Sequence, residues 1–196
     1  MASARSETHT VASTKIVIAG GFGAGKTTFV GAVSEIMPLR TEAILTEASV
    51  GVDELEGTPE KKTTTVAMDF GRITLGDEDL ILYLFGTPGQ RRFWFMWDDL
   101  VRGAIGAVIL VDVRRLQDSF ATIDYFEARR LPFLIAINDF DGAPSYPEGE
   151  VRKALSLPVE VPVISIDARQ RDSAKQALIT IAEYALAQLT PAAPFH

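Results

Sequence analysis

The segment Gly20–Thr27, which reads GGFGAGKT, places the strongest constraint on what this chain can fold into. It matches the pattern G-x-x-x-x-G-K-[ST], in which glycines let backbone N–H groups turn inward on a polyphosphate. The apolar, β-branched run Lys15–Ala19 before it predicts a buried strand, and a helix is predicted from Gly25 to about Ile36, before Pro38. A strand, a glycine loop and a helix N-terminus in this order favour bound phosphate, so the segment predicts a nucleoside triphosphate site.

Within this loop the side chains and the backbone have separate expected tasks. Lys26 is expected to reach the β- and γ-phosphates, and the hydroxyl of Thr27 to bind Mg²⁺, a hard cation that prefers oxygen ligands. The backbone expected to surround the phosphates is that of Gly21, Phe22, Gly23, Ala24 and Gly25. A chance glycine turn is the alternative, and the full length of the motif in its strand–helix context argues against it.

The rest of the chain alternates strand and helix patterns. Apolar or alternating runs predict strands at 66–75, 80–85, 106–112, 133–138 and 161–166, and helical periodicity falls at about 91–102, 115–130, 148–156 and 171–189. This alternation implies a three-layer α/β fold with a mostly parallel sheet covered on both faces, and the turn Gly76–Asp79 adds one antiparallel hairpin at its edge. Leu39–Lys62, acidic and weakly periodic, is expected to be a long functional loop.

Composition and length narrow the class of protein further. They predict one domain over residues 13–190, between tails at 1–12 and 191–196. The net charge of −7 argues against a nucleic-acid partner. The chain has no cysteine, which excludes disulfides, thiolate metal sites, prenylation and palmitoylation, and no apolar run is long enough to span a membrane. A cytoplasmic location is therefore expected, with any membrane association made through a partner.

A second motif follows the strand predicted at 133–138, where the chain reads AINDFD over Ala136–Asp141. The carboxylate of Asp141 can accept hydrogen bonds from the N1–H and the exocyclic amine of guanine, a pair of donors that adenine does not offer. Asn138 is expected to contact the base edge and to tie this segment to the phosphate loop. The alternative is a strand that ends in an Asx-rich turn.

With these motifs in place, the chain resembles the Ras-like small GTPases of bacteria over residues 12–190. Ala136–Asp141 resembles their N-K-x-D motif, with Asp139 in place of the lysine, and Phe85–Gln90 (FGTPGQ) stands where they have D-x-x-G-Q. Thr63–Thr65 stands at their switch threonine, and Ile164–Arg169 resembles their S-A-K loop. The strings TTTVAMDFG and LFGTPGQRRFWFMW are similar to the GTP-binding proteins of actinobacterial conservons and, more distantly, to gliding-motility-type GTPases.

The resemblance implies a Ras-like P-loop domain that binds GTP or GDP with Mg²⁺. It places Gln90 where it orients the attacking water, and Thr64 or Thr65 where a switch residue contacts Mg²⁺ or the γ-phosphate; plain strand residues are the alternative for the threonines. The other nucleotide contacts that it implies are Thr28 at the α-phosphate, Gly89, and the base loop Asp167, Ala168 and Arg169. As partners it implies a roadblock/LC7-type protein and a sensor-kinase-like signalling complex.

Several residues depart from the family pattern. Gly86 replaces the aspartate that holds the magnesium hydration shell, a role that Asp69 or Asp112 could take over. The ring of Phe22 could crowd Gln90, so very slow intrinsic hydrolysis is expected. Arg91 and Arg92 are candidates for an arginine finger supplied in cis, or else an exposed, solvated pair.

Three functions remain open at this point. The first is a GTPase switch, the second a pseudo-GTPase that binds guanine nucleotides without turnover, and the third a general P-loop ATPase or kinase, which Asp139 leaves possible. The aromatic run Phe93–Trp97 is expected to bury some side chains and to expose others to a partner, or to pack entirely inside.

Overall fold

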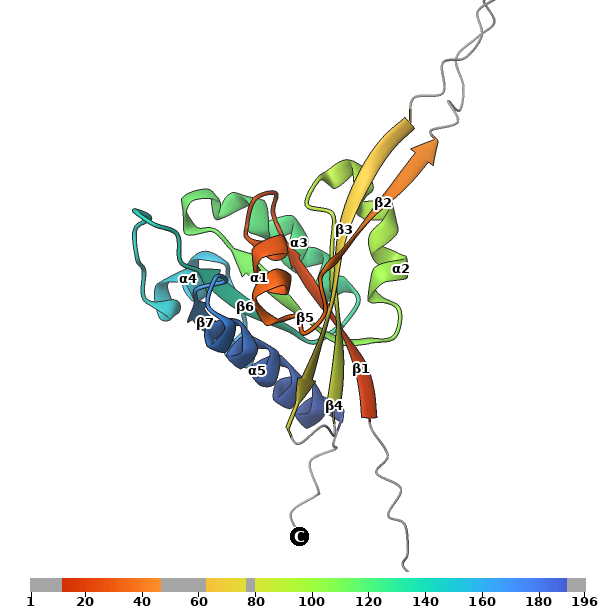
Figure 1. Cartoon of the computed structure of the whole chain (residues 1–196). Coiled ribbons are helices and arrows are strands. Elements are labelled where there is room, and N and C mark those ends of the chain that lie inside the picture. Colours follow the sequence, from red (N-terminus) through yellow and green to blue (C-terminus); the bar gives the residue numbers. More distant parts are fainter. Residues whose placement is uncertain (1–11, 47–62, 77–79, 190–196) are drawn as a thin grey trace, which may run out of the picture.

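The computed structural model describes residues 12–46, 63–76 and 80–189, whose strands form one seven-stranded sheet in the order β2-β3-β4-β1-β5-β6-β7 (Figure 1). The strands are β1 (Ala12–Gly20), β2 (Leu39–Thr46), β3 (Thr63–Leu75), β4 (Leu80–Gly86), β5 (Ala104–Val111), β6 (Phe133–Asn138) and β7 (Val163–Ile166). The α-helices are α1 (Lys26–Val33), α2 (Trp97–Val101), α3 (Gln117–Ala128), α4 (Glu148–Ala154) and α5 (Arg171–Leu189), and the short 3₁₀ helices are η1 (Arg91–Met96) and η2 (Val113–Arg115).

The direction of the strands confirms the predicted mixed sheet. β1 lies at the centre, parallel to β4 and β5, and β6 and β7 continue the parallel part. β3 runs antiparallel to both β4 and β2, so the predicted hairpin edge carries one more strand than expected. The carboxyl ends of β1, β5 and β6 therefore meet at one edge of the sheet, where a ligand site is expected.

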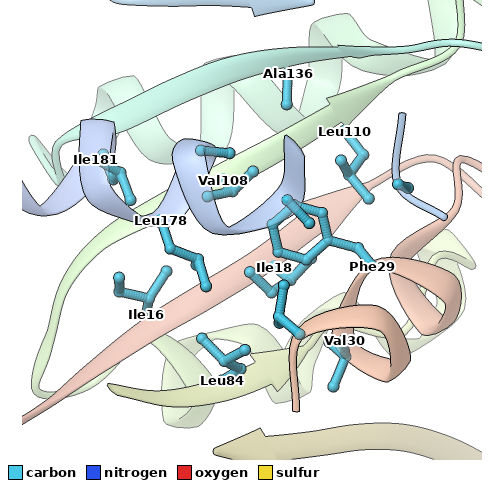
Figure 2. Packing of buried hydrophobic residues seen from close by; sticks show 14 of the residues in the cluster. Ile16, Ile18, Phe29, Val30, Leu84, Val108, Leu110, Ala136, Leu178 and Ile181 are labelled. Carbon is cyan, nitrogen blue, oxygen red and sulfur yellow. The ribbon is translucent and has the colours of Figure 1, made fainter. Parts of the chain in front are cut away.

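Two apolar layers hold the helices on the two faces of the sheet. Ile16 and Ile18 of β1 pack with Phe29 of α1 and Leu178 of α5, as Figure 2 shows. The β1 residues between these two and after them, Val17 and Ala19, point to the opposite face of the sheet. There they pack with residues of α2 and α3. Side chains of a strand alternate between faces, so a strand that is buried throughout needs a helix layer on each side. The three-layer prediction is confirmed.

The helix after the phosphate loop is shorter than predicted. It ends at Val33 rather than near Ile36, because Ser34 leaves the helical conformation with φ −62° and ψ 135°. The next backbone N–H, of Glu35, donates to the carbonyl of Arg72 at 2.7 Å. The connection is thus tied to β3 before Pro38 is reached, and that proline does not end the helix.

The prediction of a loop over Leu39–Lys62 is wrong for its first part. Leu39–Thr46 is β2, paired antiparallel with β3 along its whole length, and Figure 1 shows the two strands as a long ribbon. An edge strand forms because it pairs with the neighbouring strand. The pattern of apolar and polar residues within the edge segment is a poor predictor of that pairing. The backbone of Thr63–Thr65 also lies in this ribbon, and the rest of the predicted loop, residues 47–62, lies outside the described residues.

Candidate nucleotide-binding site

The phosphate loop joins the end of β1 to the start of α1 at the carboxyl edge of the sheet. Two of its glycines are required by the geometry. Gly20 has φ +140°, and a Cβ there would lie 2.5 Å from the carbonyl oxygen of Leu110. Gly25 has φ +103°, and a Cβ there would lie 2.5 Å from Nδ2 of Asn138. The loop thus keeps its curled form while packed against β5 and β6.

Lys26 is the buried cation of this loop. Its Nζ donates to the carbonyls of Gly20 at 2.9 Å and Gly21 at 2.7 Å. Burial lowers the pKa of Lys26 to about 8, and the nearby carboxylate of Asp69 partly offsets that effect. The amine is therefore still mostly charged at neutral pH, held by carbonyls that a phosphate oxygen could replace.

A carboxylate from β3 stands beside the magnesium-binding threonine that the motif predicts. The hydroxyl of Thr27 donates to Oδ2 of Asp69 at 2.6 Å. The β3–β4 register sets Asp69 next to Gly86, where an added Cβ would lie 3.1 Å from Cβ and 3.3 Å from Oδ2 of Asp69. Asp69 thus fills the space that an aspartate at position 86 would use.

A further oxygen supports the fit to a hydrated Mg²⁺. The hydroxyl of Thr87 is buried and has no hydrogen-bond partner in the part of the chain that the structure describes, yet Thr87 lines the cavity over the phosphate loop. Buried polar atoms are normally paired, so this hydroxyl is suited to contact an ion that prefers oxygen ligands, or a water bound to that ion. Thr27, Asp69 and Thr87 are the residues that would hold the ion. Asp112, the other candidate, is bound to Arg114 instead, which lowers its pKa.

The segment after β4 lies against the phosphate loop. A Cβ on Gly89 would be 2.9 Å from both Cα of Phe22 and Nζ of Lys26. The ring of Phe22 is 66% exposed, and the side chain of Gln90 is also exposed. The structure thus brings together the predicted residues Lys26, Thr27 and Gly89, whereas the side chains of Thr64, Thr65, Arg91 and Arg92 lie outside the described residues.

Four of the predicted base residues line a second cavity of about 320 Å³, namely Asn138, Asp141, Ala168 and Arg169, whereas Asp167 lines a different cavity. The second cavity adjoins the cavity of about 400 Å³ over the phosphate loop. Gly25 and Thr28 line both cavities. Asn138, 4% exposed, donates through Nδ2 to the carbonyl of Ala24 at 3.0 Å and accepts from the N–H of Ala168 at 2.9 Å. The two cavities can therefore hold the phosphates and the base of one nucleotide.

An arginine in the lining of the base cavity pairs with the predicted guanine-reading carboxylate, Asp141. Nη1 of Arg169 donates to Oδ2 of Asp141 at 2.8 Å, and Nε of Arg169 donates to Oδ1 of Asp167 at 2.9 Å. The hydrogen bonds that Arg169 donates to Asp167 lower the pKa of Asp167. A guanidinium and the edge of guanine both offer neighbouring N–H donors, and both would use the carboxylate of Asp141 as the acceptor. A guanine that bound Asp141 would therefore have to displace Arg169.

Sequence reasoning missed two arginines of η2 that touch the site. Arg114 lines the base cavity, and Nη2 of Arg115 donates to the carbonyl of Phe22 at 2.8 Å. Both follow Asp112 at the end of β5. Charged residues directly after a buried strand were the available signal, because the carboxyl ends of parallel strands gather at the ligand edge.

The aromatic run Phe93–Trp97 is partly buried in the core. Trp97 is fully buried and its Nε1 donates to the carbonyl of Pro88 at 3.2 Å, which anchors the segment that carries Gly89. Phe93 is also buried, whereas Phe95 is 63% exposed. The mixed arrangement, with some side chains inside and at least one outside, is the one observed.

Asn138→Ala is expected to destabilise the protein by about 1–3 kcal/mol, because it leaves the Ala24 carbonyl and the Ala168 N–H buried without their partner. Denaturant unfolding measures the change. Asn138→Asp is the matched variant, since it keeps the acceptor for Ala168 and loses only the donor to Ala24. Equal stability of Asn138→Ala and the natural protein would contradict the bridging role.

Comparisons with known proteins agree with the fold. Residues 18–188 match the model of a family described as "Conserved hypothetical ATP binding protein". An uncharacterized protein of Methanocaldococcus jannaschii is 29% identical over 129 residues, which cover 65% of this chain and 70% of that protein. Ras-related protein Rab-1A of Dictyostelium discoideum is 26% identical over 140 residues, or 67% and 69% of the two chains. The G domain of the FeoB iron transporter of T. maritima superposes with a TM-score of 0.59 at 18% identity, over 88% of this chain and 99% of that one.

The fold and the phosphate loop together place this chain in the class of nucleoside-triphosphate-binding P-loop proteins with a G-domain fold. More particularly, the chain belongs to the family described as conserved hypothetical ATP binding proteins. Among the helices in the described ranges, none has the length and apolar character needed to cross a membrane.

Proposed function

We propose that this protein is a guanine-nucleotide-binding switch that hydrolyses GTP slowly. The observation that carries the proposal is the base cavity, where Asn138 joins the phosphate loop to the Ala168 loop and Asp141 stands at the wall. A carboxylate at that place pairs with the two donors of guanine and meets no matching pair on adenine. Guanine is therefore favoured over the adenine that the family description names.

Slow turnover is expected from the residues around the phosphates. Gln90 is the residue that would orient the attacking water. The carboxylate proposed to serve Mg²⁺, Asp69, comes from β3, and the exposed ring of Phe22 lies in the phosphate loop. We expect unassisted hydrolysis at or below the ~10⁻⁴ s⁻¹ scale of Ras-type domains. A pseudo-GTPase without turnover is the second candidate, favoured by Gly86 and Phe22.

The partners are proposed from the resemblance to GTP-binding proteins of actinobacterial conservons. They are a roadblock/LC7-type protein and a sensor-kinase-like complex, in a cytoplasmic signalling assembly that could draw the protein to a membrane. Phe95 supports a partner contact close to the nucleotide, because its exposed ring lies in η1, which begins directly after Gln90. Apolar groups exposed next to a nucleotide-sensing segment suit a partner that reads the bound state.

Isothermal titration of nucleotide-free protein with GTP, GDP and ATP, with Mg²⁺ and again with chelator, tests the base assignment. We expect guanine nucleotides to bind more tightly and Mg²⁺ to strengthen GTP binding. Comparable affinities for ATP and GTP would overturn the assignment and favour a general P-loop ATPase. Multiple-turnover phosphate release then separates a slow GTPase from a pseudo-GTPase, which releases none.

A further inference from the structure

Arg114 places a rigidly held guanidinium in the wall of the base cavity. Its Nε donates to Oδ1 of Asp112 at 2.9 Å and its Nη2 to Oδ2 at 2.8 Å, a bidentate pair. The backbone N–H of Arg114 donates to the same Oδ1 at 3.0 Å. Because Asp112 is 4% exposed, the carboxylate that grips the guanidinium edge is itself fixed at the end of β5.

One face of this guanidinium is already stacked. Its Cζ lies 4.1 Å from the ring centroid of Phe140, the third residue of the segment Asn138–Asp141. The Arg114 side chain nevertheless remains 44% exposed and lines the cavity together with Phe140. A flat cation with its edge held by a carboxylate and one face on a ring loses little freedom when a ligand arrives.

Position 139 lacks a cation that the family motif has. Asp139 stands where the motif that it resembles has a lysine, which by that resemblance covers the base with an alkyl chain and a cation, and the exposed carboxylate of Asp139 supplies neither. A planar guanidinium stacks well on aromatic faces and attracts their electrons. In sequence Arg114 is far from this motif, but it touches the motif in the fold.

We propose that the Arg114–Phe140 stack is the surface on which the purine ring of the nucleotide lies, so that η2 supplies the cationic cover missing at position 139. This inference rests on the proposed nucleotide-binding function and adds a base-positioning residue to it. Arg114 meets the ring face rather than its hydrogen-bonding edge. It therefore strengthens binding of guanine and adenine nucleotides alike, whereas Asp141 separates them.

Titration of Arg114→Ala with Mg²⁺-GDP, Mg²⁺-ADP and magnesium pyrophosphate tests this. Loss of the stack is expected to weaken GDP and ADP binding by a similar factor of about 2 to 30, the range of cation–π contacts, and to leave pyrophosphate binding unchanged. Lys153→Ala, which removes an exposed cation on α4, is the matched control and should bind all three as the natural protein does.

A second variant protects the test from misfolding, because Arg114→Ala leaves Asp112 with fewer partners. Phe140→Leu removes the ring and keeps the Asp112–Arg114 pair, and it is expected to weaken GDP and leave pyrophosphate unchanged. Unaltered GDP affinity in both variants, with the natural protein preferring GDP to pyrophosphate, would overturn this inference alone. Natural protein that binds GDP no better than pyrophosphate would overturn it together with the proposed function.

Discussion

Asp69→Asn is expected to weaken Mg²⁺ binding by the GTP-bound protein about 100-fold, the upper range for groups that orient a metal's ligands and waters. The substitution removes the carboxylate charge next to Thr27. In the natural protein this carboxylate accepts a hydrogen bond from the hydroxyl of Thr27 at 2.6 Å. An amide of the same shape leaves the strand pairing of β3 in place. Titration of Mg²⁺ into the nucleotide complex, with nucleotide dissociation as the readout, measures the loss.

The opposed positions 69 and 86 offer a rescue. Gly86→Asp alone is crowded, because a Cβ there lies 3.1 Å from Cβ of Asp69. Asp69→Gly together with Gly86→Asp clears that contact and moves the carboxylate from β3 to the neighbouring β4. The exchanged protein should recover most of the Mg²⁺ affinity. Unchanged affinity in Asp69→Asn would show that this carboxylate does not serve the metal. No recovery in the exchange would show that a carboxylate at position 86 cannot replace it.

Local motifs were predictable because the chemistry lies in consecutive residues. The motif Gly20–Thr27 is sufficient to predict the phosphate loop, and the side chain of Asn138 makes the predicted hydrogen bond to that loop. The missing aspartate at Gly86 was visible too, and the sequence narrowed its replacement to Asp69 or Asp112. Only the pairing of β3 with β4 decides between them, since it brings Asp69 to Gly86 while Asp112 is bound by Arg114.

What the sequence did not predict depends on contacts between distant segments. β2 forms because Leu39–Thr46 pairs with β3, and its own residues carry no clear alternation. Arg114 belongs to the base cavity because η2 lies against the loop after β6, a neighbourhood set by the strand order β5-β6. The ion pair of Arg169 with Asp141 likewise joins the ends of β6 and β7.

Asp141→Ala is expected to lower the affinity for GDP by about 100-fold or more and to leave ADP nearly unchanged. Two charge-assisted hydrogen bonds to the guanine edge are lost, each of about 1.5 kcal/mol at the low end. The low end applies because the carboxylate is 89% exposed and Arg169 already competes for it. Titration with both nucleotides gives the ratio of affinities, which is the quantity that matters.

Two further variants separate base reading from simple charge. Asp139→Ala removes a neighbouring exposed carboxylate and should keep the preference for GDP. Arg169→Ala removes the group that a guanine edge must displace from Asp141, so it is expected to speed GDP association while the preference over ADP remains. Equal losses of GDP and ADP in Asp141→Ala, or the same change of ratio in Asp139→Ala, would mean that the carboxylate does not read the base. The base selectivity would then have to arise elsewhere in the cavity, and the guanine assignment would fall with it.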